Sequence, residues 1–482
     1  MTHGSAKRLR ALAAAFAVAS MFLSSSTVMA QAAPHPARHV PSSSSSSSPS
    51  SSPSSSPSPS PGRLAEIYAD VWFKLGETYI DPSRLTNWGE WQHKYDGKLK
   101  TEQDLDAALD AMANSLHDTW TGYESSHQRL LEVFAAVRGL VDLGMVLKEN
   151  EQGDLIVKIA PFGSLARDNG LQAGDQVISI NGKALAGLSP TALEEALRVP
   201  VTSTVVVVYH TGASTKVDTA SGVVAPAPLA DAIRSVTFKA VPSTAPLAEA
   251  HMLDNGIMYA RLSSFRDGPA DIGVLNNSVT ALLASCQCNP RGMILDLRGN
   301  PGGSFELVLK EAAFFLPGKT IVTSTTREGN LVTSSSYRAE MLTSFESAGL
   351  SEPQRKMIDV FTNSPMVVLV DGSTASAAEL FTGALKDNHR ALVVGVRTFG
   401  KGVGFDEIEV PLGGQLTVTK LHYMTPSGFD VSAGGIEPDV DVEQPRRDVT
   451  AAQASSVTAP DRDLQLTVGL AELEKRISAA RR

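Results

Sequence analysis

The chain has 482 residues, enough for roughly two to four domains. Hydrophobic residues make up 42% of the sequence and charged residues 19%, a balance typical of a globular protein with buried cores. The net charge of −9 leaves no basic surplus to neutralise phosphates, which argues against an electrostatic nucleic-acid binder.

The first thirty residues have the three-part pattern of a secretory signal peptide. Basic residues lie between positions 7 and 10, an apolar run covers 11–23, and Val-Met-Ala ends at Ala30. A membrane anchor is the alternative, but this apolar run is shorter than the about 20 residues a spanning helix needs. We therefore expect residues 1–30 to be removed, and the mature chain to be periplasmic or secreted without a membrane span.

The following segments differ sharply in composition. Residues 31–62 are dominated by Ser and Pro, which cannot bury apolar surface, so a disordered linker is predicted. Residues 63–130 have apolar side chains at helical spacing and predict a helical region. Residues 131–212 read as short strands with two helical segments between them, which indicates a small mixed barrel.

The largest region, residues 213–445, alternates strand and helix patterns. Apolar runs such as "GMILDLRGN" and "PMVVLVD" predict buried strands, and "FELVLKEAAFFL" and "ASAAELFTGALKD" predict helices. This alternation indicates an α/β core. A tail over residues 446–482 is expected to end in an amphipathic helix.

A serine-rich turn follows one of these predicted strands. The strand is expected to end at Asp371, and Ser376 lies where the next helix begins. The free amides of a first helical turn and the helix dipole favour an oxyanion there. Taken alone, the turn is explained more simply by Ser and Thr residues that cap a helix.

Lys401 lies between two glycines in "RTFGKGVG". As a general base it would have to be neutral near pH 7. The fold would then have to lower its pKa by roughly 3 units, about 4 kcal/mol. Burial can achieve this, although an isolated loop lysine is usually solvated.

The motif "LDLRGNPGG" places Asp296 and Arg298 at the end of a predicted strand. Gly302 and Gly303 follow in a turn that can bring a bare N–H against a reacting carbonyl. A tight turn explains these glycines equally well.

Together, "LDLRGNPGG", "GSTASAAE", "GKG", "YMTPSG" and "GGIEPDV", in this order, resemble the C-terminal processing (tail-specific) serine peptidases. The resemblance extends over about residues 63–442 and includes that family's N-terminal helical region and embedded PDZ domain. It implies an α/β (α+β) fold in which a crotonase-like ββα protease core carries a PDZ β-barrel domain.

The resemblance assigns roles by position. It implies that Ser376 is the nucleophile of an acyl-enzyme mechanism and that Lys401 is its general base. The implied oxyanion donors are the amide of Ala377 and one of the Gly302 and Gly303 amides. The family's supporting positions fall on Asp296, Arg298 and Glu379, for which a plain salt-bridge role is equally compatible.

One position departs from the family pattern. Family members usually have a glutamine four residues after the lysine to orient it, and here that residue is Phe405. Counting back from Pro411, where the family has a matching proline, moves the position to Glu407. A carboxylate can orient Lys401 but also stabilises its charged form. The sequence does not decide whether Phe405 or Glu407 orients Lys401.

The PDZ-like region implies peptide capture. In "DLGMVL" the amides of Leu143, Gly144 and Met145 would hold the terminal carboxylate of a substrate, whose tail adds as a β-strand. The expected function is that of an exported serine endopeptidase acting on proteins with exposed C-termini, without metal or cofactor.

Two other functions remain as alternatives. Phe405 motivates a catalytically impaired PDZ adaptor on a protease fold, and His389 or His422 would be the base of a Ser-His hydrolase. The two cysteines, Cys286 and Cys288, lack nearby metal ligands, and the sequence leaves open whether they are reduced or bridged.

Overall fold

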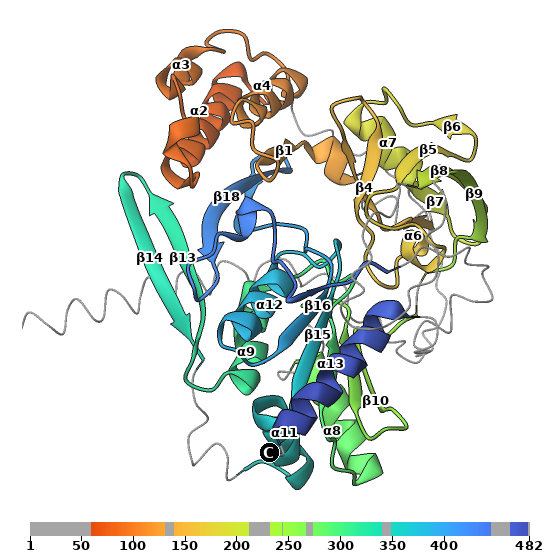
Figure 1. The fold of residues 1–482 in the computed structure, drawn as a ribbon. Helices are drawn as coiled ribbons and strands as arrows, with labels where there is room; N and C mark the ends of the chain where they lie inside the picture. The colour runs from red at the N-terminus through yellow and green to blue at the C-terminus, as the bar shows by residue number, and fades with distance from the viewer. Residues whose placement is uncertain are drawn as a thin grey trace, which may run out of the picture. The chain divides into compact units, whose positions relative to one another are not determined.

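The computed structural model describes residues 59–130, 139–211, 232–242, 244–266, 273–339, 349–444 and 463–480 (Figure 1). The predicted signal peptide and nearly all of the predicted linker lie outside these residues. The chain divides into two compact units, one of residues 1–125 and 406–418, the other of residues 126–405 and 419–482.

The first unit is a helical cluster built on an apolar core. Leu64, Leu75, Leu105 and Leu109 are fully buried in it, together with Leu416 from the tip of a hairpin. A capping box between Thr101 and Asp104 starts α4. The elements are α2 (Pro61–Thr78), η1 (Pro82–Arg84), α3 (Trp88–His93), α4 (Glu102–Asn114) and β1 (Gly122–Glu124).

The second unit begins with a small β-rich region. Its main sheet has the order β3-β4-β5-β8-β9, so β3 is an edge strand. The sheet continues beyond residue 212 because β9 pairs with β8 along its whole length. The elements are β2 (Leu140–Asp142), β3 (Val146–Glu149), β4 (Leu155–Ile159), α6 (Leu165–Asp168), β5 (Gln176–Ile180), β6 (Lys183–Ala184), α7 (Pro190–Leu197), β7 (Arg198–Pro200), β8 (Thr204–Thr211) and β9 (Ala232–Lys239).

The rest of the second unit is built around a sheet of order β10-β11-β12-β15-β16-β19. All neighbouring strands are parallel except β10, which runs antiparallel to β11. The strands are β10 (Ala248–Met252), β11 (Met258–Leu262), β12 (Met293–Asp296), β15 (Met366–Val370), β16 (Leu392–Gly395) and β19 (Val440–Asp441). This arrangement confirms the α/β core that the alternating pattern predicts.

Helices cover both faces of this sheet. One face packs on α8 (Val274–Cys286), α9 (Phe305–Phe315), α11 (Glu352–Asn363) and α12 (Ala377–Asp387). The other face packs on α13 (Leu464–Ala480), seen in Figure 1 across β15 from α12. Alternate strand residues serve the two faces: Val368 joins the first core and Val367 the second. Burial on both faces explains why these strands are continuous apolar runs.

A long hairpin completes the second unit. It consists of β13 (Thr320–Glu328) and β14 (Leu331–Arg338), and β13 also pairs with residues 421–424 of β18. The remaining elements of the chain are η2 (Val431–Ala433) and two strands that each contribute residues to both units, β17 (Val403–Val410) and β18 (Gly414–Met424). Cys286 and Cys288 form a disulfide at the C-terminal end of α8. Within the described residues, no helix combines the length and apolar character that a bilayer span requires.

Candidate active site

Three loops leave the carboxyl ends of neighbouring parallel strands and meet. Residues 297–303 follow β12, residues 371–376 follow β15, and residues 396–401 follow β16. The amide of Ala375 donates to Asn300 O (2.9 Å), and that of Phe399 donates to Thr374 O (3.0 Å). The edge where such loops gather is the usual ligand site of an open α/β sheet.

Ser376 begins α12 in an unusual backbone conformation. Its φ of 54° and ψ of −121° lie in a region that residues with a side chain seldom adopt. Its amide donates to Glu379 Oε2 (2.8 Å), and its Oγ lies 3.5 Å from the hydroxyl of Tyr423. Such strain persists only where the surroundings impose it, and it is concentrated at active sites.

Two backbone amides beside Ser376 are available to a ligand. Within the described residues, neither the N–H of Ala377 nor that of Gly303 has a hydrogen-bond partner. The amide of Gly302 is already used, since it donates to Asn300 Oδ1 (2.9 Å). A Cβ at residue 302 would lie 2.8 Å from both Ala377 N and Ser376 Cβ, so only glycine fits this close approach.

Lys401 lies in a largely desolvated position. Burial lowers the pKa of its ammonium group to about 8, although the nearby Glu379 carboxylate opposes the change. Its Nζ lies over the Phe405 ring, 4.5 Å from the ring centre. Its carbonyl oxygen accepts a hydrogen bond from Tyr423 Oη.

Glu379 joins the serine turn to the lysine loop. Its buried carboxylate accepts from the amides of Ser376 (2.8 Å), Gly400 (2.6 Å) and Lys401 (2.8 Å), and from the hydroxyl of Thr398 (2.5 Å). Burial raises the pKa of Glu379, and these hydrogen bonds counteract the rise. One side chain therefore fixes the backbone at both Ser376 and Lys401.

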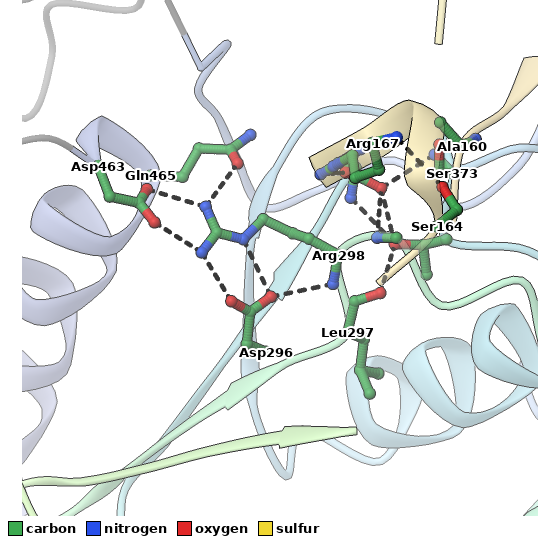
Figure 2. Close-up of polar contacts among 12 residues, drawn as sticks. Ala160, Ser164, Arg167, Asp296, Leu297, Arg298, Ser373, Asp463 and Gln465 are labelled. Carbon is green, nitrogen blue, oxygen red and sulfur yellow. Dashed lines mark hydrogen bonds and ion pairs between the residues drawn. The ribbon is translucent and has the colours of Figure 1, made fainter. Parts of the chain in front are cut away.

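The loop of residues 297–303 is anchored by a buried ionic network. Arg298 Nε and Nη2 donate to the two oxygens of Asp296 (2.9 and 2.6 Å), and Arg261 Nη2 donates to Asp296 Oδ2 (2.7 Å). Figure 2 shows Arg298 also reaching Asp463 and Gln465. The two guanidinium groups hold the pKa of Asp296 well below its usual range despite its burial.

The β-rich region contacts the same loops from its α6 side. Arg167 Nη2 donates to Asp371 Oδ2 (2.6 Å), and Asp371 Oδ1 accepts from the amide of Gly299 (2.9 Å). The amide of Ala160 donates to Ser373 Oγ (3.1 Å), in the same group of contacts in Figure 2. The amide of Phe162 also donates to Gly299 O (2.9 Å), so the β-rich region is bonded directly to the loops of residues 297–303 and 371–376.

Comparison with known proteins identifies the two parts of this arrangement. The model of peptidase family S41 matches residues 256–442, which contain all three loops. Residues 256–442 are thereby identified as a peptidase S41 region. A PDZ domain model matches residues 136–208, within the β-rich region. The chain is therefore a serine peptidase with an embedded PDZ domain, and the family resemblance found in the sequence is confirmed.

Relatives of this peptidase carry consistent names. A carboxyl-terminal-processing protease of Synechocystis sp. is 29% identical over 377 residues, covering 78% of this chain and 80% of that protein. The carboxy-terminal processing protease CtpA of Bacillus subtilis is 27% identical over 357 residues, covering 73% and 67%. Among solved structures, a photosystem II D1 C-terminal processing protease aligns with a TM-score of 0.60 at 21% identity. It covers 81% of this chain and 99% of that one, so the fold is shared.

The other residues predicted for the site, which were alternatives for orienting or replacing the lysine base, lie as follows. Glu407 is exposed and accepts a hydrogen bond from Gln415 Nε2 (3.1 Å), whereas Phe405 contacts Lys401. His422 lies on β18 with its Nε2 3.0 Å from Asp430 Oδ1. The described residues include no group of three or more His, Cys, Asp or Glu side chains able to hold a metal ion.

In the PDZ domain, two of the three candidate amides are already bonded. The amide of Leu143 donates to Leu197 O (2.9 Å), and that of Gly144 donates to Asp142 Oδ1 (2.6 Å). In the described part of the chain, the amide of Met145 has no partner. Sequence reasoning missed Asp142 as a partner in this loop, although its place two residues before Gly144 is typical of an Asx turn.

Proposed function

We propose that this peptidase is an exported endopeptidase that uses a Ser376–Lys401 dyad to cleave proteins at or near their C-termini. The observation that carries the proposal is the Glu379 carboxylate, which bonds the backbone of both residues. It supports a fixed relation between a strained serine and a lysine whose pKa burial lowers to about 8. A neutral lysine near the working pH is what a general base requires.

The mechanism follows from these groups. Ser376 Oγ attacks the scissile carbonyl carbon, and its proton passes to Lys401 Nζ. The negative charge on the carbonyl oxygen is stabilised by the unpaired amides of Ala377 and Gly303. When the C–N bond breaks, the protonated Lys401 gives its proton to the departing amine. Lys401 then takes a proton from a water molecule as the water attacks the acyl carbon, and it gives this proton to Ser376 Oγ when the ester bond breaks.

Substrate capture is assigned to the PDZ domain. Among the described strands β3 lies at the edge of its sheet, where an extended peptide can pair with it. The amide of Met145, which has no partner among the described residues, precedes this strand. The side chain of Val146 is 49% exposed on this strand, available to an apolar substrate residue. A tail bound here by its terminal carboxylate would direct the protease to the C-terminal part of its substrate.

Export is proposed from the leader pattern of residues 1–30, which lie outside the described part of the chain. Cell fractionation with N-terminal sequencing of the full-length product tests it. A mature protein beginning after Ala30 outside the cytoplasm is the expected result, and a cytoplasmic protein that retains Met1 contradicts it.

The dyad is tested with Ser376→Ala and Lys401→Ala on a peptide with an apolar C-terminal tail. Both variants are expected to lose cleavage while still binding the tail peptide. Ser335→Ala on β14 and the exposed Lys319→Ala are matched controls and should keep full activity. Full activity in either dyad variant would exclude the mechanism.

The alternative of an inactive PDZ adaptor predicts a different pattern. The unchanged protein would bind the tail peptide without turnover, and an acylating serine probe would not label Ser376. Labelling that depends on Lys401 excludes the adaptor. Retained activity of the His389→Ala and His422→Ala variants excludes a histidine base.

A further inference from the structure

The helix α13 is connected to the catalytic loops through the first residues of its chain segment. Asp463 precedes the helix, and its Oδ1 accepts from the amide of Leu466 (2.9 Å) as an N-cap. Asp463 and Gln465 are both buried, and both lie beyond residues 256–442, to which the family model is matched. Neither position could therefore be assigned from the family motifs.

The guanidinium of Arg298 is saturated by Asp296 and this segment together. Nε and Nη2 bond Asp296, while Nη1 and Nη2 donate to the two oxygens of Asp463 (2.8 and 2.7 Å). Nη1 also donates to Gln465 Oε1 (3.2 Å). Because an arginine has five N–H donors in one plane, this set fixes the orientation of the whole group (Figure 2).

The charges in the network balance only when Asp463 is included. Arg261 and Arg298 carry two positive charges, and Asp296 and Asp463 carry two negative ones. All four side chains are at most 8% exposed. Removing one member of such a buried set leaves an uncompensated charge, which is strongly destabilising locally. Asp463 therefore supplies the second negative charge that stabilises Arg298 in its buried position.

Arg298 belongs to the same short loop as the available glycine amide. One residue before it, Leu297 O accepts from Thr374 Oγ1 (2.9 Å). Beyond it, Asn300 O accepts from Ala375 N, and Asn300 Oδ1 accepts from Gly302 N (both 2.9 Å). A shift of Arg298 is passed along this backbone to Gly303, whose amide faces no partner within the described residues.

We infer that Asp463 and Gln465 are positioning residues for catalysis: they hold Arg298 and so set the 297–303 loop that presents the Gly303 amide. The C-terminal helix is by this inference part of the catalytic machinery rather than only a cover for the sheet. The inference rests on the proposed function, since it assumes that this amide stabilises the oxyanion.

The test is Asp463→Asn in the full chain, with kcat and KM measured on a tail peptide. Asparagine keeps the size and the helix cap but removes the charge that holds Arg298. We expect kcat to fall at least about tenfold with KM within twofold, because small misplacements of a catalytic group are costly. Glu474→Gln is the control on the same helix. It breaks the partly exposed pair with Arg291 and should leave kcat unchanged.

Gln465→Met is a second variant, which removes a hydrogen-bond acceptor of Arg298 without changing the charge. If Asp463→Asn does not fold, the kcat of Gln465→Met tests the inference. A kcat within twofold of the unchanged enzyme in the folded variant overturns the inference, provided that Ser376→Ala is inactive. If Ser376→Ala remains active, the proposed function fails instead. Amide hydrogen exchange of residues 297–303 then tests Asp463 alone: faster exchange in Asp463→Asn supports its positioning role, and unchanged exchange overturns it.

Discussion

The Nζ of Lys401 lies 4.5 Å from the centre of the Phe405 ring. Phe405 is four residues after the lysine, where the family that the sequence resembles usually has a glutamine. An aromatic face attracts the ammonium group without accepting a directed hydrogen bond, and it favours the charged form. We therefore propose that Phe405, rather than Glu407, orients the general base. The aromatic contact tends to raise the pKa of Lys401, whereas burial lowers it, and burial is the larger of the two influences.

Replacing Phe405 with Leu is expected to lower kcat roughly fivefold, since a partly desolvated cation–aromatic contact contributes about 1 kcal/mol. Phe405→Gln should retain more activity than Phe405→Leu, because the amide oxygen can accept from Lys401. Steady-state kinetics on one tail peptide measures both. Glu407→Gln is the control and should match the unchanged enzyme. A large loss in that variant would instead assign the orienting role to Glu407.

The pKa of about 8 for Lys401 predicts the pH dependence of cleavage. Below that value the base is protonated, so kcat/KM should rise about tenfold per pH unit and level off above pH 8. The same burial makes the charged lysine costly in the native state at pH 7. Lys401→Met is therefore expected to raise the free energy of unfolding at pH 7 by up to about 3 kcal/mol while abolishing activity. A flat profile between pH 6 and pH 8 contradicts the assignment.

Glu379 accepts four hydrogen bonds, so Glu379→Gln turns an NH₂ group toward backbone donors that need an acceptor. Leaving such buried groups unpaired costs about 1–3 kcal/mol each. We expect kcat to fall by at least about 100-fold and the urea midpoint to decrease. Glu437→Gln, which alters an exposed pair with Arg397, is the matched control and should change neither value.

The sequence predicted the parts of the fold that depend on local pattern. Buried strands such as β12 and β15 are continuous apolar runs, and α12 begins after a serine-rich turn as expected. The sequence could not predict that Asp463 meets Arg298, because 165 residues separate them and no local pattern links them. Long-range ion pairs are fixed by the packing of α13 on the sheet, which emerges only in three dimensions.

In the candidate site, too, local motifs predicted some features and others became clear only from the three-dimensional contacts. The motifs identified Ser376, Lys401 and the glycine turn, but they could not distinguish the Gly302 amide from that of Gly303. The difference comes from Asn300, whose side chain folds back onto Gly302. Counting along the chain likewise did not decide between Phe405 and Glu407. Their contacts separate them, because the Phe405 ring lies under Lys401 Nζ whereas Glu407 accepts a hydrogen bond from Gln415.

The burial of Glu311 on α9 predicts that the stability of the protein depends on pH. It is buried without a hydrogen-bond partner for Oε2 among the described residues, and burial raises its pKa to about 8. Between its ordinary value of 4.5 and about 8, the native state keeps a proton that the unfolded state has lost. Stability therefore falls as pH rises through this window, by about 1.4 kcal/mol per pH unit.

Glu311→Gln is expected to remove most of this slope, so that the variant is more stable than the unchanged protein at pH 8 and similar to it at pH 5. Urea unfolding at four pH values between 5 and 8 measures the effect. Glu306→Gln is the control: Glu306 is a partly exposed residue of the same helix paired with Lys310, and its replacement should leave the slope intact. Equal slopes in all three proteins contradict the role of Glu311.

The position of Asp142 predicts that replacing it will increase the affinity of the PDZ domain for a peptide with a free C-terminal carboxylate. Its Oδ1 accepts from the amide of Gly144 in the loop where a substrate's terminal carboxylate is proposed to bind. A negative charge there repels that carboxylate by about 1 kcal/mol near 4 Å in a water-like medium. Asp142→Asn keeps the acceptor for Gly144 but removes the charge, so the Kd of a tail peptide should fall roughly fivefold. Fluorescence anisotropy in the inactive Ser376→Ala background measures it, and the same peptide with an amidated C-terminus is the control. If Asp142→Asn improves both peptides equally, the effect is not carboxylate repulsion, and the proposed binding mode at Met145 is wrong.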